Sequence, residues 1–487
     1  MNEAIEIRAP HGSVIEQRQT KKRFGALSVA RVLSSVIFLS LLVTILLTAI
    51  PYGTVQPWWI AIFECLIFSL CILGLIEAVI SKRTLVSDAR LAAPLIALGL
   101  FMLFQSLPLF SERDNTGLIN LKFSLSADPY NTRLLAIRVF ALIGAGLLLL
   151  RYASGKKRLR TLIYVVIGVA LASALFGILR KGFQQSPGFF LPALNNDDRS
   201  FAQFINRNHF GFLMEMGLGM TLGLLLGDRN RRRTLVFLPI AAVLWIALVI
   251  SNSRGGIVAS LGQLLFLGVL LDPLGRLAKQ PALTAWNRFR NLAGGIALRV
   301  ILIACMVALF AYGVAWVGGE SVVTNFQLAG YSFSQQGMDE EQRANTSRKD
   351  IWSSTWKLIK AHPLAGVGFG GYWIGITKHH NASGSLTPQE AHNDYLELLA
   401  SGGLIGSALV IWFIAVFLGR ARKSWICTDP YLRAASLGAL TGIFGVAIHS
   451  FVDFGLHVTS NALILCALVV IAVHQANEKT SQMRTTP

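Results

Sequence analysis

The stretch AHNDYLELLASGGLIG, residues 391–406, stands almost directly before the apolar run ALVIWFIAVFLG at 408–419. The first stretch offers an imidazole, an amide, a carboxylate and a phenol at consecutive positions, whereas the second has no charged side chain. Because charged groups are costly in lipid, the second run is typical of a membrane interior. The sequence therefore places ionisable chemistry at the boundary of a membrane-like segment.

The whole chain has the composition of a membrane protein. Of its 487 residues, 53% are hydrophobic and only 14% are charged, where a soluble domain has about a quarter charged. A helix crosses a bilayer with about 20 mostly apolar residues. Twelve such runs predict an all-α polytopic membrane protein with about 12 transmembrane helices. The runs are 32–50, 58–80, 91–110, 135–150, 162–180, 210–227, 235–251, 255–274, 299–318, 403–419, 434–451 and 458–474.

The net charge of +19 is unevenly distributed along this pattern. If the N-terminal tail is cytoplasmic, the loops on its side hold 29 of the 44 Lys and Arg residues. This bias predicts that both termini are cytoplasmic. It also favours contact with anionic membrane lipid over nucleic acid as the reason for the basic charge. The loops are 1–31, 81–90, 151–161, 228–234, 275–299, 420–433 and the C-terminal tail.

Three regions follow from this topology. Residues 1–31 form a cytoplasmic tail that we expect to be disordered, 32–474 form the transmembrane domain, and 475–487 form a second cytoplasmic tail. The transmembrane domain includes a large loop on the opposite side, at 319–402, for which we expect short helices. In that loop SRKDIWSSTWKLIKAH (347–362) has the spacing of an amphipathic helix, which either lies at the membrane interface or packs on the membrane domain. Five cysteines without a C-x-x-C pair favour neither a disulfide framework nor a zinc site.

Polar residues gather where the apolar runs end on the side of the large loop. In INRNHFGFLMEMG, Asn206 or Asn208 can cap a helix, and Arg207 and His209 can lie at the interface. Glu215 is deeper in the same run. An ionisable group there is costly unless it faces a partner or a wet cavity.

Two further stretches lie beside apolar runs. SNSRGG (251–256) joins two of them; a turn this tight requires its glycines, but not Arg254, which is well placed to meet an anion. HSFVDFGLH places His449, Asp453 and His457 four residues apart, so one face would present all three if the segment is helical. A metal-ligand set is the alternative interpretation, although the spacing matches no known ligand motif.

The opening stretch itself contains both structural and chemical candidates. Asp394 and Glu397 have the spacing of a capping box, which predicts the start of a helix. His392, Asn393 and Tyr395 are not explained in this way. They join the arginines of this face, which are Arg207, Arg254, Arg343 and Arg348.

This combination suits a pyrophosphate substrate. Arginine binds phosphate oxygens through two parallel hydrogen bonds and stabilises the charge on a departing pyrophosphate. A neutral histidine or a carboxylate takes the proton of an attacking hydroxyl. The candidate acid–base groups are His209, His392, His449 and Tyr395.

The same residues resemble those of the O-antigen ligase and polysaccharide polymerase family of bacterial membrane glycosyltransferases. HNDYLELLASGGLIG resembles the most recognisable stretch of that family, and RKDIWSSTWKLIKAHPLAGVGFGGY resembles the segment that precedes it. FINRNHFGFL and SNSRGG resemble its earlier motifs, in the expected order. The resemblance covers about residues 130–460, and the NRNH and HSFVDFGLH segments are closer to exopolysaccharide polymerases.

The resemblance implies a protein of the bacterial inner membrane whose large loop is periplasmic. It implies transfer of a glycan from undecaprenyl pyrophosphate to a sugar hydroxyl of a glycan or a lipid A–core acceptor, with inversion and without a metal or other cofactor. It also suggests polysaccharide assembly proteins as partners. Arg254 and His392 match the family's pyrophosphate-binding arginine and loop histidine, and Arg207 and Arg348 match further arginines. We add Tyr395 and His209 as catalytic candidates; the supporting residues are Asn393, Asp394, Glu215, His449 and Asp453.

Two other classes compete with this hypothesis. A secondary transporter suits twelve spans, and Glu64 and Glu215 favour it; however, the chain has no paired broken helices or repeat halves. A structural scaffold of the cell envelope is the third class. Sequence alone leaves open ligase, polymerase or protein oligosaccharyltransferase, the sugar, the acceptor and the oligomeric state.

Overall fold

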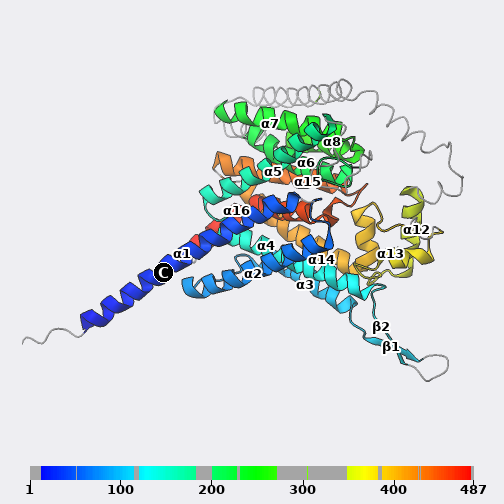
Figure 1. Cartoon of the computed structure of the whole chain (residues 1–487), viewed down its shortest axis with the longest axis horizontal. Helices are drawn as coiled ribbons and strands as arrows, with labels where there is room; N and C mark the ends of the chain where they lie inside the picture. The colour runs from blue at the N-terminus through cyan, green and yellow to red at the C-terminus, as the bar shows by residue number, and fades with distance from the viewer. Residues whose placement is uncertain are drawn as a thin grey trace, which may run out of the picture.

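The computed structural model describes residues 12–50, 52–113, 120–182, 200–227, 231–270, 304, 348–381, 387–425, 427 and 429–483. These residues form a bundle of long helices (Figure 1), which confirms the predicted all-α membrane fold. Seven of the described helices are long and apolar enough to cross a membrane, and four shorter helices are also apolar. Most of the predicted run 299–318, residues 319–347 of the large loop and Arg343 lie outside the described residues.

The other eleven predicted runs coincide with helices. Between α3 and α4, the chain forms one antiparallel hairpin in which Phe110 pairs with Phe123. The elements before the large loop are α1 (Gly12–Ala49), α2 (Pro57–Ser81), α3 (Ala89–Gln105), β1 (Phe110–Arg113), β2 (Asn120–Phe123), α4 (Pro129–Tyr152), α5 (Lys156–Gly182), α6 (Arg207–Gly227), α7 (Arg231–Ile250) and α8 (Arg254–Leu270). The later elements are α12 (Arg348–Ala361), α13 (Tyr372–Gly375), η1 (Ile376–Lys378), α14 (Asp394–Trp425), α15 (Pro430–His449), η3 (Gly455–His457) and α16 (Thr459–Met483).

The first and last helices are longer than their predicted spans. α1 begins at Gly12, inside the tail that was expected to be disordered, and α16 continues to Met483, inside the second tail. A helix that has formed across an apolar run extends at little cost into a polar flank, because each added residue gains one hydrogen bond.

The centre of the bundle is the pair α6 and α15. Every residue of α6 from Phe210 to Leu224 is buried. A Cβ added to Gly219 would lie 2.3 Å from the backbone nitrogen of Gly442, and one added to Gly223 would lie 2.1 Å from the Cα of Gly438. Small residues four apart on both helices thus let the two backbones touch, which is a common way for membrane helices to pack tightly.

The described part of the large loop packs on the bundle. On α12, Ile351, Leu358 and Ile359 are buried, and the Trp352 indole donates to the carbonyl of Ala391 at 3.0 Å. Of the two interpretations of this amphipathic helix, packing on the rest of the chain is the one observed. The short helices in the described part of the loop are α12 and α13.

The glycine-rich segment after α12 is fixed to a kink in α14. Gly403 has φ +59° inside α14, and the next residue, Leu404, donates to the carbonyl of Pro363 at 2.9 Å. Gln105 of α3 donates to the carbonyls of Ala365 and Ser401 at 2.6 and 3.0 Å. The kink separates the polar first turns of α14 from its apolar remainder, which begins where the sequence predicts a span.

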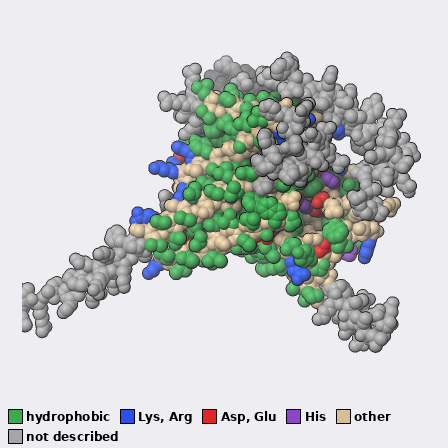
Figure 2. Space-filling model, in the orientation of Figure 1, with side chains coloured by type: hydrophobic (Ala, Val, Ile, Leu, Met, Phe, Trp, Pro, Cys, Tyr) green, Lys and Arg blue, Asp and Glu red, His purple; other side chains and the backbone are tan. Residues whose placement is uncertain are grey.

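The two ends of the bundle differ in their polar side chains. In Figure 2 the flank between them is mostly hydrophobic, and purple and red side chains gather on the right, near α12 and α13 in Figure 1. Many large apolar side chains on the flanks are exposed, among them Leu39, Ile72 and Ile411 at 62%, 59% and 64%. Such a surface requires lipid around it. We name the end near α12 and α13 the site end, and we define the basic end by Glu77, Asp88, Arg151, Lys156, Arg420 and Asp429.

Candidate functional site

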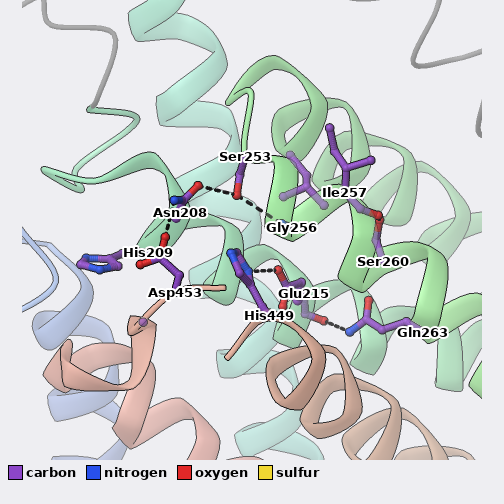
Figure 3. A network of polar contacts seen from close by, with 12 residues as sticks. Asn208, His209, Glu215, Ser253, Gly256, Ile257, Ser260, Gln263, His449 and Asp453 are labelled. Atoms are coloured by element: carbon purple, nitrogen blue, oxygen red, sulfur yellow. Dashed lines mark hydrogen bonds and ion pairs between the residues drawn. The ribbon is translucent and has the colours of Figure 1, made fainter. Parts of the chain in front are cut away.

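The site end begins at the first turn of α6. Asn206 caps this helix, because its Oδ1 accepts a hydrogen bond from the backbone of Asn208 at 2.8 Å. Asn208 instead binds through its side chain, whose amide nitrogen donates to Asp453 and whose amide oxygen accepts from the Ser253 hydroxyl at 3.0 Å. Figure 3 shows Asn208 between these two partners. One amide thus joins α6, the turn before α8 and the segment after α15.

The turn SNSRGG is built differently from the prediction that its glycines make the turn. Asn252 adopts the left-handed conformation, at φ +60°, and α8 starts at Arg254. The glycines are required by packing, since a Cβ on Gly255 would lie 2.4 Å from the His449 ring nitrogen Nε2, and one on Gly256 would lie 3.3 Å from Glu215. The end of α15 therefore approaches the start of α8 only because position 255 has no side chain.

Beneath this turn lies a buried contact between Glu215 and His449. The Nδ1 of His449 is 2.6 Å from Glu215 Oε1, and both residues are fully buried. The expectation that Glu215 requires a partner is thus confirmed. Gln263 of α8 adds a further link, because its amide donates to the carbonyl of Glu215 at 2.8 Å (Figure 3) and to that of Thr441 at 3.1 Å.

The segment HSFVDFGLH is not one helix. It leaves α15 at His449, and the backbone of Val452 and of Asp453 closes a turn onto the His449 carbonyl at 2.9 and 3.1 Å. As a result His449 is inside the bundle while Asp453 faces Asn208, so the idea of a shared helical face with His457 is wrong. Among the residues that the structure describes, no three His, Cys, Asp or Glu side chains are grouped as metal ligands are.

His392 lies beside Asp453 at the entrance to α14. Its Nδ1 is 3.8 Å from Asp453 Oδ1, and a third of its side chain is exposed. Its backbone has φ +49°, a conformation that few residues other than glycine adopt and that is concentrated at functional sites. The contacts around the start of α14 and Asp453 thus hold the backbone of His392 in a conformation that is otherwise unfavourable.

The cap of α14 is not the residue that the capping-box spacing predicts. Asn393 is the cap, since its Oδ1 accepts from the backbone of Tyr395 and Leu396 at 3.1 Å each. Glu397 turns back to the amide of Ala391 at 2.9 Å. The backbone of Asp394, by contrast, donates to a carbonyl of the segment after α15, at 2.9 Å. A capping box with Glu397 requires Asp394 at the cap, but the cap is the preceding residue, Asn393.

Tyr395 binds within the protein. Its hydroxyl donates to the carbonyl of Ala447 at 2.7 Å, and its ring lies 4.4 Å from that of Phe451. Both contacts tie the start of α14 to the end of α15. The hydroxyl of Tyr395 is therefore part of the framework that positions the neighbouring His392.

Three arginines from three elements meet at this end. Arg348 starts α12, and its Nη2 is 3.5 Å from Asp453 Oδ2. Arg254 starts α8 and is close enough to Arg207, on α6, and to Arg348 for their positive charges to act on it. Guanidinium groups that come together from three elements are suited to bind an anion.

Asp453 is the central acid of the site and is fully buried. Burial alone would raise its pKa, but the contact with His392 and the nearby imidazoles of His209 and His449 hold the pKa of this carboxyl below its usual range. The Phe454 amide also donates to it at 2.9 Å. Asp453 therefore stays ionised at neutral pH beside the arginines.

Phe454 brings three histidines together. The rings of His209, His392 and His457 each meet it edge-on, with centroids 4.9, 4.8 and 5.6 Å away. The predicted residues His209, His392 and Asp453, together with the arginines, thus lie in one cluster, while Glu215 and His449 lie beneath it.

Several residues of the site were missed by the sequence-based prediction. They share a polar or aromatic side chain inside or beside an apolar run. Only Gln263 carried a signal in the sequence, because a glutamine inside such a run is costly unless it has a buried partner. The missed residues are Ser253, Gln263 and Phe454, while Asn208 was considered only as a possible helix cap.

Part of the chain matches a protein-family model. Residues 239–411 match the model of the O-antigen ligase family. The match contains the turn with Arg254, all of α12 and the start of α14, whereas Asn208 and Asp453 lie on either side of it. The comparison with curated proteins gives no match. The resemblance to the O-antigen ligase and polysaccharide polymerase family is thus confirmed at residues 239–411.

Proposed function

We propose that the protein transfers a glycan from undecaprenyl pyrophosphate to a sugar hydroxyl of a glycan or lipid A–core acceptor. The observation that carries the proposal is the cluster of Arg207, Arg254 and Arg348 beside the pair of His392 and Asp453. A polyprenyl chain lies in the membrane while its pyrophosphate and sugar stand at the surface. An enzyme acting on this donor must carry its chemistry at one end of a hydrophobic bundle, as this chain does.

The arginines bind the pyrophosphate. Their planar guanidinium groups match pairs of phosphate oxygens, and they come from α6, α8 and α12, so that they can approach an anion from different sides. A pyrophosphate between them would also relieve the repulsion that Arg254 experiences from its two neighbours. The same contacts strengthen as negative charge develops on the leaving group.

In the proposed step the acceptor hydroxyl oxygen attacks the anomeric carbon of the donor sugar. The bond between that carbon and the pyrophosphate oxygen breaks, and its electron pair leaves with undecaprenyl pyrophosphate. The proton of the hydroxyl passes to His392. A single displacement of this kind inverts the anomeric configuration.

Asp453 supports this transfer without taking the proton. Its pKa is held below the usual range, so it remains a carboxylate facing the Nδ1 side of His392. A buried carboxylate in that position orients the imidazole and stabilises the imidazolium that forms. The contacts of Asp453 with Asn208 and Arg348 connect this histidine to the arginine cluster.

We further propose that the site end is periplasmic and that both termini are cytoplasmic, in the inner membrane, because of the bias of Lys and Arg toward the opposite loops. His362 is exposed directly after α12, and Lys82 is exposed at the basic end. His362→Cys should then react with a membrane-impermeant maleimide in intact cells, and Lys82→Cys only after lysis. The reverse pattern would contradict the orientation.

The function is tested with purified protein in detergent. Donor lipid carrying its glycan is incubated with lipid A–core or with unmodified donor as acceptor, and products are read by mass spectrometry. Glycan transfer without any ion gradient supports the enzyme. Absence of transfer, combined with gradient-driven uptake in vesicles, would instead support the transporter.

A further inference from the structure

A cavity lies beside the site, and the transfer chemistry above does not use it. Its volume is about 410 Å³, within the range of roughly 300–1,000 Å³ found for small-molecule pockets. It opens between the start of α4, the glycine-rich segment with α13, and the first turns of α14. The polar and aromatic side chains that matter here are Asn131, Trp373, Gln389, Glu390, Glu397 and His457.

The walls of this pocket are held in place by contacts outside it. Asp128, which caps α4, accepts hydrogen bonds from the Asn131 side-chain amide at 2.6 Å and from the Trp373 indole at 3.1 Å. The amide of Gly370 donates to Thr132 at 2.9 Å, and a Cβ on Gly370 would lie 2.4 Å from the Thr132 nitrogen. The aromatic ring and the amide are therefore fixed before any ligand arrives.

The charge of the pocket is opposite to that of the arginine cluster. Glu390 and Glu397 line it, and its described lining includes no lysine or arginine. Glu397 is buried, with its Oε1 3.4 Å from the His457 ring nitrogen. A pyrophosphate would meet no arginine or lysine of the described lining here. Carboxylates and amides beside an aromatic ring suit a sugar, whose hydroxyls donate to the former while its apolar face covers the ring.

The pocket is connected to the proposed base through Phe454. His457 lines the pocket and His392 lies beside Asp453, and both rings meet the Phe454 ring edge-on. The sugar that must present a hydroxyl to His392 is the acceptor, because the donor is held by its pyrophosphate at the arginines. From its contents and its position, we propose that this pocket binds the acceptor sugar, and that this sugar is neutral or amino-substituted rather than acidic.

This inference rests on the proposed function, and two variants test it. Trp373→Ala removes the ring, and Glu390→Gln keeps the shape of the side chain but removes its charge. Trp356→Ala is the matched control, since Trp356 is half exposed on α12 and does not line the pocket. Each pocket variant should raise the KM for acceptor about tenfold, as expected for losing one strong contact, and leave the KM for donor unchanged.

A binding measurement separates this proposal from the function on which it rests. The probe is the oligosaccharide released from purified donor lipid by mild acid, and its contact with the protein is read by saturation-transfer NMR. The wild type and Trp356→Ala should give a signal that both pocket variants lose, while thermal melting shows that all the variants are folded. If the wild type binds the probe in this way but transfers nothing, the proposed function fails while the sugar site stands.

Two results would overturn the inference. The pocket is not a sugar site if the wild type gives no signal with the probe, or if both variants keep the signal and the acceptor KM of the wild type. A rise in donor KM alone would overturn its assignment to the acceptor.

Discussion

The basic end and the site end use the same residue types with opposite results. At the basic end, carboxylates meet cations one by one: Arg151 donates to Glu77 at 3.1 Å, Arg420 pairs with Asp88 at 2.9 Å, and Lys156 pairs with Asp429. At the site end, Arg254 lies close enough to two other arginines to be repelled by both, and Asp453 is shared among Arg348, Asn208 and His392.

The difference shows which end is built for stability and which for binding. A carboxylate matched to one cation has no need of a ligand, and Asp88 and Asp429 also cap α3 and α15. Arginines from three elements gathered near a buried carboxylate offer several guanidinium groups to an incoming anion. The following four variants test this contrast, in order of their expected effect.

Arg254→Lys should have the largest effect of the four. Lysine keeps the charge but loses the paired hydrogen bonds to phosphate. Losing such a contact in the transition state costs about 3 kcal/mol, or on the order of a hundredfold in rate. Turnover per folded molecule is measured by mass spectrometry beside Arg420→Lys, which makes the same change at the basic end. Equal rates for the two variants would remove the distinction between the ends.

Gly255→Ala should lower turnover about tenfold without touching any arginine, a drop that corresponds to about 1.4 kcal/mol. The new methyl would lie 2.4 Å from the His449 ring, which is fully buried, so the start of α8 and with it Arg254 must shift. Overpacking of this kind also costs about 1–3 kcal/mol of stability. Gly262→Ala is the control on the same helix, because its methyl would meet chiefly the tip of the Ile448 side chain. If both variants behave alike, the close contact does not position Arg254.

Glu77→Gln should destabilise the protein and leave turnover per folded molecule unchanged. It breaks a buried network with Arg151 and with the Tyr152 hydroxyl, which donates to Glu77 at 2.9 Å. Arg151 keeps its hydrogen bonds to Thr84 and Ser81, so the loss of the Glu77 charge costs about 1 kcal/mol. Thermal melting in detergent reports the loss. A selective loss of turnover in the molecules that remain folded would show that the two ends are coupled.

Lys156→Ala should have the smallest effect. The hydrogen bond from Lys156 lowers the pKa of Asp429, so the pair stabilises the fold above the unfolded pKa of about 3.9 and loses this contribution as pH falls through the lower folded value. Lys156 is 61% exposed, which limits the stability to at most about 1 kcal/mol. Melting temperatures should show a small deficit that is constant at neutral pH and shrinks as the pH falls below about 3.9. A deficit that stays constant in acid would exclude the ion pair as its cause.

Sequence patterns predicted most of the fold because apolar length and charge bias act locally. Eleven predicted runs correspond to helices, and the position of Glu215 inside an apolar run predicted that it has a partner. The tight packing of α6 on α15 also has a signal in the sequence, because Gly219 and Gly223 and then Gly438 and Gly442 repeat at an interval of four.

The rest of the site depends on tertiary contacts that no local pattern contains. The cap of α14 is one residue away from the predicted one because Asp394 bonds to Ser450, on a different helix end. The spacing of Glu397 predicted a capping box, whereas this residue lines a pocket with Asn131 and His457 from distant segments. Phe454 is an ordinary aromatic residue in sequence, and only the fold places three histidines around it.

The proposed mechanism depends above all on His392 accepting the proton of the attacking hydroxyl. The experiment that tests this role compares the wild type with His392→Ala in glycan transfer per folded molecule and in donor binding. His362→Ala is the control, because His362 is exposed on the same loop. Asn393→Ala, which removes the cap of α14, reports the stability that a loosened helix start alone costs, about 1 kcal/mol. If His392 is the base, His392→Ala binds donor lipid, stays folded and transfers no glycan. Turnover near that of the wild type would show that it is not.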